Sequence, residues 1–236
     1  MSISPTWQDR LLLGAAGAAL MMTQYLAARE IGASFFSTEL VLVGAVVVTL
    51  VGPSLAYALA HRLGPRLLAV WGALSVATHL ALPFGVRAMV GTMAYHRVEA
   101  WALVVTVVCG MLLLCGFYAV FLPRCTRTPQ SLPALYAAEL AGAILGLLLL
   151  VLSPTHRVAL AVYWSLAAAV LHLGLRRRLL TASVALAAVA LTILYPRLDE
   201  LAARRYYSGY WGVARPRMVE TRHSPYHRVD VVDTDQ

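Results

Sequence analysis

The chain has 236 residues, of which 60% are hydrophobic and only 13% are charged. A soluble domain carries roughly twice that share of charged residues, so the composition excludes an ordinary soluble globular protein and predicts an integral membrane protein. The formal net charge is +8, and the nineteen Lys and Arg residues are all arginines. We interpret these arginines as loop residues that face lipid headgroups, and the pattern does not favour a nucleic-acid-binding surface.

Apolar segments of spanning length recur along the first 196 residues. A helix needs about 20 residues to cross the hydrocarbon core of a bilayer, and seven segments are close to this length or longer. They cover residues 11–28, 35–60, 67–90, 98–122, 132–152, 158–175 and 179–195. We therefore predict an all-α integral membrane bundle of about seven transmembrane helices over residues 1–196. Six or eight spans are the alternatives.

The segment 132–152 combines an apolar run with one carboxylate and a pair of glycines. Gly142 and Gly146 are four residues apart, a spacing that lets two helices approach closely within a membrane. Glu139 lies in the same run, and a carboxylate faces lipid only at a large free-energy cost. We expect these residues to face other helices, which places this helix at the centre of the bundle. Helix packing within the monomer is the favoured role of the glycines, and a homodimer face is the alternative.

The sequence changes character after the seventh span. Residues 197–217 combine a short amphipathic segment with aromatic side chains that suit the headgroup layer, and we predict an interfacial linker there. Residues 218–236 show the pattern strand, turn, strand, with β-branched residues on both sides of Ser224-Pro225. Two strands alone form an unstable sheet. We therefore expect this short β-hairpin-like extension to be completed by another protein chain.

Three stretches resemble one known family. They are QYLAARE at residues 24–30, LYAAELAGAILG at 135–146 and VETRHSPYHRVDVVDTD at 219–235. They are similar to bacterial membrane proteins in which a multi-span helical domain precedes a spermidine-synthase-like (polyamine aminopropyltransferase) domain. Glu220 and Ser224-Pro225-Tyr226 fit the opening strands of that domain, whereas His227 stands where the family has a glutamine that helps to hold the nucleoside substrate.

The resemblance implies a multi-pass protein of the bacterial inner membrane whose catalytic partner is elsewhere. In the family, catalysis belongs to a Rossmann-like domain with a glycine-rich loop. The sequence contains no strand–GxGxxG–helix unit, so we expect neither catalytic residues nor a bound cofactor in this chain. A soluble aminopropyltransferase-like domain on a separate chain would then dock against the tail. The residues expected to form that docking site are Glu220, Tyr226, His227, Val229 and Val231.

Carboxylates within or beside the predicted spans give an alternative function. Glu39 and Glu139 lie inside spans and Glu99 lies near an interface, and intramembrane ionisable residues are candidates for a functional site. They could form an acidic cavity for a small cation, such as a polyamine or a proton, in a transporter. The competing interpretation is structural: Glu39 and Glu139 would be hydrogen-bonded inside the bundle or paired with Arg29 or Arg87.

Two histidines inside spans give a third hypothesis. His79 and His172 could ligate a haem in a redox subunit if their imidazoles faced each other at one depth. Packing histidines are favoured instead, because His79 lies at mid-span and His172 near a span end. No cysteine or histidine pattern typical of a zinc site is present, so no metal site is predicted.

Overall fold

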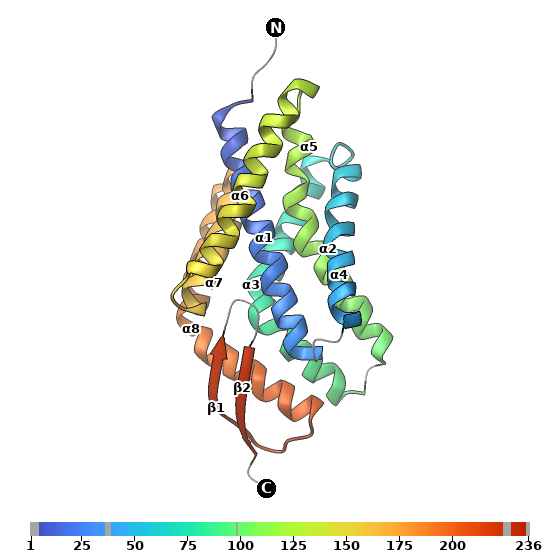
Figure 1. Cartoon of the computed structure of the whole chain (residues 1–236), viewed down its shortest axis with the longest axis vertical. Coiled ribbons are helices and arrows are strands. Elements are labelled where there is room, and N and C mark those ends of the chain that lie inside the picture. The colour runs from blue at the N-terminus through green and yellow to red at the C-terminus, as the bar shows by residue number, and fades with distance from the viewer. Residues whose placement is uncertain (1–4, 36–38, 98, 224–227, 235–236) are drawn as a thin grey trace.

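The computed structural model describes residues 5–35, 39–97, 99–223 and 228–234. Within these residues, seven long helices form a bundle and a two-stranded sheet lies at one end of it (Figure 1). The long helices are α1 (Trp7–Phe35), α2 (Glu39–Leu59), α3 (Pro65–Tyr95), α4 (Ala100–Ala119), α6 (Leu132–Leu152), α7 (His156–Leu175) and α8 (Arg178–Tyr210). Between α4 and α6 lie a short helix, α5 (Phe121–Cys125), and a 3-10 turn, η1 (Pro129–Ser131). The strands are β1 (Pro216–His223) and β2 (Arg228–Thr234).

The predicted class is confirmed in its coarse form, a mostly helical chain that carries a small antiparallel sheet near its C-terminus. Five helices of the described chain are long and apolar enough to cross a membrane: α1, α3, α6, α7 and α8. The described parts of the remaining helices contain the shorter apolar segments Thr49–Leu59 and Leu114–Cys125. A seven-span membrane bundle stays a prediction.

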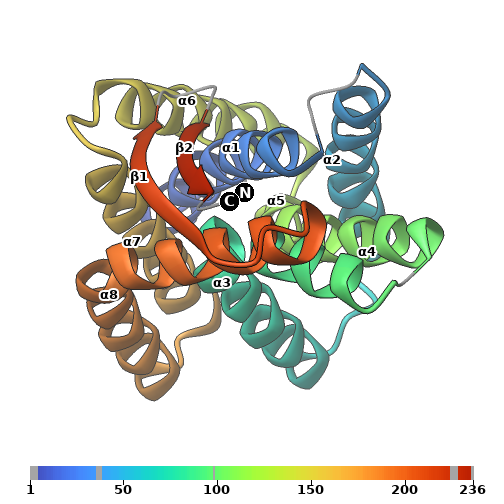
Figure 2. The same cartoon turned by 90° about the horizontal axis from the view of Figure 1, so that it is seen from below.

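Helix α1, and not α6, lies at the centre of the bundle. In the view along the bundle, α6, α7, α3 and α2 surround α1 (Figure 2), and its side chains are buried on several faces. Helix α6 buries a single stripe, which consists of Leu135, Glu139, Gly142, Gly146 and Leu150. The prediction that residues 132–152 form the central helix is therefore wrong. An apolar run has the same composition whether its outer face meets lipid or protein, so composition did not distinguish the two positions.

The contact between α1 and α6 depends on glycine. A Cβ added at Gly142 would lie 2.7 Å from the Gly14 Cα and closer still to the Gly14 carbonyl oxygen. A Cβ at Gly146 would lie 2.8 Å from the Ala18 Cα. Both neighbours are backbone atoms of α1, which cannot move aside as a side chain can. The predicted helix-packing glycines thus lie where two backbones meet directly.

Helix α8 continues well past the predicted end of the last span. Pro196 lies inside it, and the helix changes direction so that its last turns run across the end of the bundle (Figures 1 and 2). A proline removes one backbone hydrogen bond and commonly kinks a helix without ending it. The first part of the expected interfacial linker, up to Tyr210, is therefore the end of α8. Gly209 and Gly91 bring this part of α8 against α3, because a Cβ at Gly209 would overlap the Gly91 carbonyl group.

The hairpin has one face toward the bundle and one face away from it. Its strands pair from Pro216 opposite Thr234 to His223 opposite Arg228, with a bulge between Met218 and Glu220. Strand β1 packs beside α8 and β2 beside the end of α1. Side chains that alternate along the strands are therefore half-buried on the inner face and exposed on the outer face.

Candidate functional site: a buried ion network beneath the hairpin

A buried ion pair joins the hairpin to the bundle. Arg228 of β2 donates two parallel hydrogen bonds to Asp199 of α8, from Nη1 to Oδ1 at 2.8 Å and from Nη2 to Oδ2 at 2.9 Å. The exposed fractions of the two side chains are 1% and 11%. A bidentate arginine–carboxylate pair constrains distance and orientation together. This pair therefore fixes where β2 sits relative to α8.

Arg228 also forms hydrogen bonds to Asp230 of its own strand, β2. Its Nε donates to both carboxylate oxygens of Asp230 at 2.8 and 2.9 Å, and Asp230 also accepts a hydrogen bond of 2.9 Å from the Thr221 hydroxyl of β1. Burial lowers the pKa of the Arg228 guanidinium, but the hydrogen bonds and charges of Asp199 and Asp230 outweigh burial and raise that pKa above its ordinary value. Arg228 is thus a permanent cation between two anions.

The pairing extends from Asp199 into the bundle. Arg87 of α3 donates to Asp199 and to the Pro83 carbonyl oxygen at 3.1 Å, and its Nε lies 3.3 Å from Glu30 Oε2. Glu30 of α1 accepts a hydrogen bond of 2.9 Å from Arg29 Nη2. The Tyr195 hydroxyl adds a hydrogen bond of 3.1 Å to Asp199. Three helices and one strand therefore share one set of buried charges.

We call this set the ion network; its members are Arg29, Glu30, Arg87, Asp199, Arg228 and Asp230. Three cations balance three anions, so the set has no formal net charge. Buried ion pairs add little net stability over apolar residues, but removing one partner leaves an unpaired charge at a cost of about 3–5 kcal/mol. The network is therefore suited to specifying one position of the hairpin.

Of the three predicted carboxylates, the structure describes the side chains of Glu139 and Glu99. Glu139 is buried where α6 meets α1, and its Oε2 has no hydrogen-bond partner among the described residues. Glu99 is exposed and precedes α4 at the hairpin end, whereas Glu139 lies in the part of α6 nearer the opposite end (Figure 1). The Glu39 side chain lies outside the described residues. Glu30 and Asp199, rather than Glu139, pair with Arg29 and Arg87.

The two histidines of the predicted spans also lie apart. His79 is fully buried, with its ring stacked on Tyr163 and edge-on to Tyr118, and its Nδ1 lies 2.6 Å from the Ser75 carbonyl oxygen. His172 is exposed in the last turn of α7. The two imidazoles therefore do not face each other, and His79 has the surroundings of a packing residue.

The predicted docking residues of the tail divide into two groups. Val229 and Val231 are 59% and 48% exposed on the outer face of the hairpin, and Glu220 pairs with Arg222 there at 2.6 Å. Tyr226 and His227 lie outside the described residues. Val219, which the sequence did not single out, is exposed in the bulge of β1.

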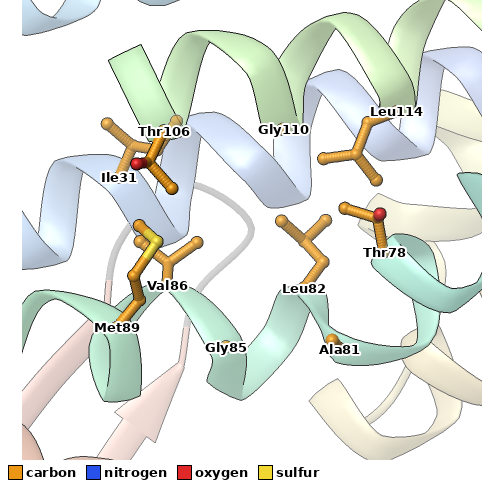
Figure 3. A pocket seen from close by; sticks show the side chains of 10 residues that line it. All are labelled: Ile31, Thr78, Ala81, Leu82, Gly85, Val86, Met89, Thr106, Gly110 and Leu114. Atoms are coloured by element: carbon orange, nitrogen blue, oxygen red, sulfur yellow. The ribbon is translucent and has the colours of Figure 1, made fainter. Parts of the chain in front are cut away.

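An apolar cavity of about 280 Å³ lies between α3 and α4, with α1 behind it (Figure 3). Gly85 and Ala81 of α3 and Gly110 of α4 leave the space open, and Leu82 points into it from α3. Its polar side chains are Thr78 and Thr106, and each hydroxyl already donates to a carbonyl of its own helix at 2.8 Å. Neither Glu139 nor Glu99 lines this cavity.

The ion network was largely missed in the sequence. Its residues at positions 30, 87, 199 and 228 are far apart in the sequence. Only the folded structure brings them together. One signal was available: Arg87 interrupts the apolar span 67–90, and a buried arginine needs an anion. The partner of Arg87 was not readable, because Asp199 lay in a segment predicted to be an interfacial linker.

Comparison with known proteins gives no match to a family model, to a curated protein or to a solved structure. In the part of the chain that the structure describes, no three His, Cys, Asp or Glu side chains gather in a way that could hold a metal ion.

Proposed function

We propose that this protein is a membrane-embedded scaffold that presents its β-hairpin to a soluble protein domain. The observation that carries the proposal is the buried, bidentate Asp199–Arg228 pair, which fixes the hairpin against the helices. A two-stranded hairpin alone is marginally stable in water. A buried charge network that holds such a hairpin in one position suits a surface on which another domain assembles.

Exposed apolar side chains support the membrane location. Large apolar residues face outward along most of the long helices, which water would not tolerate over so large a surface. Examples from five different helices are Val47, Leu74, Leu145, Val158 and Leu186. The residues of the ion network, by contrast, lie at the hairpin end of the bundle. There they would be close to the water and headgroups of the membrane surface. The bundle then spans the bilayer with the hairpin at one of its faces.

The arrangement of the helices predicts the sidedness of the termini. Seven crossings would place the two ends of the chain on opposite sides of the membrane, in keeping with their positions at opposite ends of the bundle (Figure 1). Reporter fusions at the N-terminus and at the C-terminus should therefore be active in different compartments of a bacterial cell. Activity of both fusions in the same compartment would show six or eight crossings and would contradict this topology.

The outer face of the hairpin is the proposed docking surface. Three exposed valines, Val219, Val229 and Val231, form an apolar centre with the Glu220–Arg222 ion pair beside it. An apolar centre with a polar rim is typical of protein interfaces. The resemblance of residues 219–235 to the opening strands of an aminopropyltransferase suggests the partner, a soluble spermidine-synthase-like domain on a separate chain.

Docking can be tested with a purified spermidine-synthase-like domain and nanodiscs that contain the full chain. We expect the double variant Val229→Asp/Val231→Asp to weaken binding about tenfold or more, because it places two charges at the centre of the interface. The control Val213→Asp adds a charge before β1, away from the outer face. Equal binding to wild-type and variant nanodiscs, or equal binding to empty nanodiscs, would contradict the docking proposal.

A further inference from the structure

A second, polar cavity lies at the opposite end of the bundle from the hairpin. It has a volume of about 310 Å³ and lies between the first turn of α1, the last turn of α7 and the first turn of α8. Its polar lining consists of Gln8, Asp9, His172, Arg176 and Arg178, and its apolar lining of Leu12 and Leu173. Neither the ion network nor the proposed docking surface includes any of these residues.

The charge of this cavity favours an anion. Arg176 and Arg178 supply two permanent positive charges, and Arg176 Nη2 donates a long hydrogen bond of 3.4 Å to Gln8 Oε1. Asp9 is the single carboxylate in the lining, and it is occupied in capping α1. Its Oδ2 accepts hydrogen bonds from the Thr6 backbone N–H at 3.1 Å and from the Thr6 hydroxyl at 2.7 Å.

The backbone at Arg176 gives an independent indication. Arg176 ends α7 in the left-handed conformation, with φ of 52°, where helices usually have glycine because other residues are strained there. Strain at a non-glycine residue is often retained where its side chain has a function. Arg177 precedes α8, and its side chain does not cap the helix. The first N–H groups of α8 therefore add partial positive charge at the end of the bundle where the cavity lies.

Apolar residues beside the cavity indicate where the anion comes from. Leu179, next to Arg178, is 87% exposed, and Trp7, next to Gln8, is 69% exposed. Such side chains belong in the boundary between headgroups and acyl chains, where tryptophan is enriched in membrane proteins. The arginines would then lie at the depth of lipid phosphates.

The geometry points to a binding site for the phosphate group of an anionic lipid, held by Arg176 and Arg178 at the membrane face opposite the hairpin. Free phosphate shares the same oxyanion chemistry, but it lacks the acyl chains that Leu179 and Trp7 would contact. This inference rests on the membrane location proposed above and is independent of partner docking. Failure of domain docking would therefore leave it intact.

Lipid retention in native mass spectrometry tests the site on the full chain. We expect the purified wild-type protein to retain phosphatidylglycerol in preference to phosphatidylcholine. The variant Arg176→Gln/Arg178→Gln should bind phosphatidylglycerol about 25-fold more weakly, because each interfacial arginine contributes roughly fivefold. The matched control Arg62→Gln/Arg66→Gln removes two exposed arginines at the same end of the bundle, outside the cavity, and should behave like wild type.

Two further measurements separate binding from folding and lipid from free phosphate. Arg176→Gly relieves the left-handed backbone, so it should lower lipid retention while the unfolding temperature stays at or above that of wild type. An excess of inorganic phosphate should leave the bound lipid in place. The inference is overturned if the control pair loses as much lipid as the cavity pair, if the cavity pair retains lipid normally, or if inorganic phosphate displaces the lipid.

Discussion

Asp199→Asn is expected to release the hairpin from the bundle and to destabilise the protein by about 3–5 kcal/mol. The substitution keeps the shape of the side chain but removes the anion that lies between Arg87 and Arg228. The two buried guanidinium groups would then keep only Glu30 and Asp230 as anionic partners. Chemical unfolding in mild detergent measures the change in the free energy of unfolding. Limited proteolysis of the hairpin should show new cleavage between β1 and β2.

The neighbouring residue provides the control for this prediction. Glu200 follows Asp199 in α8 but forms an exposed pair with Arg204, in which both side chains are about half exposed. Exposed pairs of this spacing contribute about 0.5 kcal/mol or less. Glu200→Gln should therefore leave both stability and protease resistance near wild type. Similar behaviour of the two variants would mean that Asp199 does not hold the hairpin.

Gly142→Ala is expected to cost about 3 kcal/mol or more, because the added methyl group meets the backbone of α1 at Gly14. Rotamer changes cannot relieve a clash with a carbonyl group, so α6 must move away from α1 along their whole contact. Thermal unfolding of the purified protein should show a large decrease in the transition temperature.

Gly110→Ala is the matched control within the same bundle. A Cβ at Gly110 would have no described heavy atom within 4 Å apart from its chain neighbours and the nearby backbone of α4, and alanine is the better helix former. We expect this variant to be as stable as wild type or slightly more stable. A Gly142→Ala protein with unchanged stability would show that α1 and α6 do not meet as closely as described.

Local features of the sequence predicted the elements well. Proline and serine residues mark both ends of the apolar run at residues 132–152. Helix α6 occupies these residues as predicted. The two strands were predicted from the β-branched residues on both sides of Ser224-Pro225. The end of α8 was not predicted, because a proline such as Pro196 normally indicates the end of a helix. Here the helix continues past Pro196, and its last turns pack against α3.

The candidate site was much less predictable than the elements. A carboxylate within an apolar run drew attention to Glu139, yet Glu139 lies between α6 and α1 and does not belong to the ion network. The residues of the ion network lie in three different helices and a strand, far apart along the chain. Their burial depends on α8 turning across the end of the bundle and on the hairpin covering them. Both are consequences of tertiary packing, which local sequence patterns do not encode.

Hydrogen–deuterium exchange of the hairpin amides, with the full chain in nanodiscs, tests the central claim most directly. A two-stranded hairpin that is not docked opens readily and its amides exchange fast. The account predicts that the paired amides of β1 and β2 are protected in wild type and in Glu200→Gln and lose this protection in Asp199→Asn. Rapid exchange of these amides in the wild-type protein would contradict it.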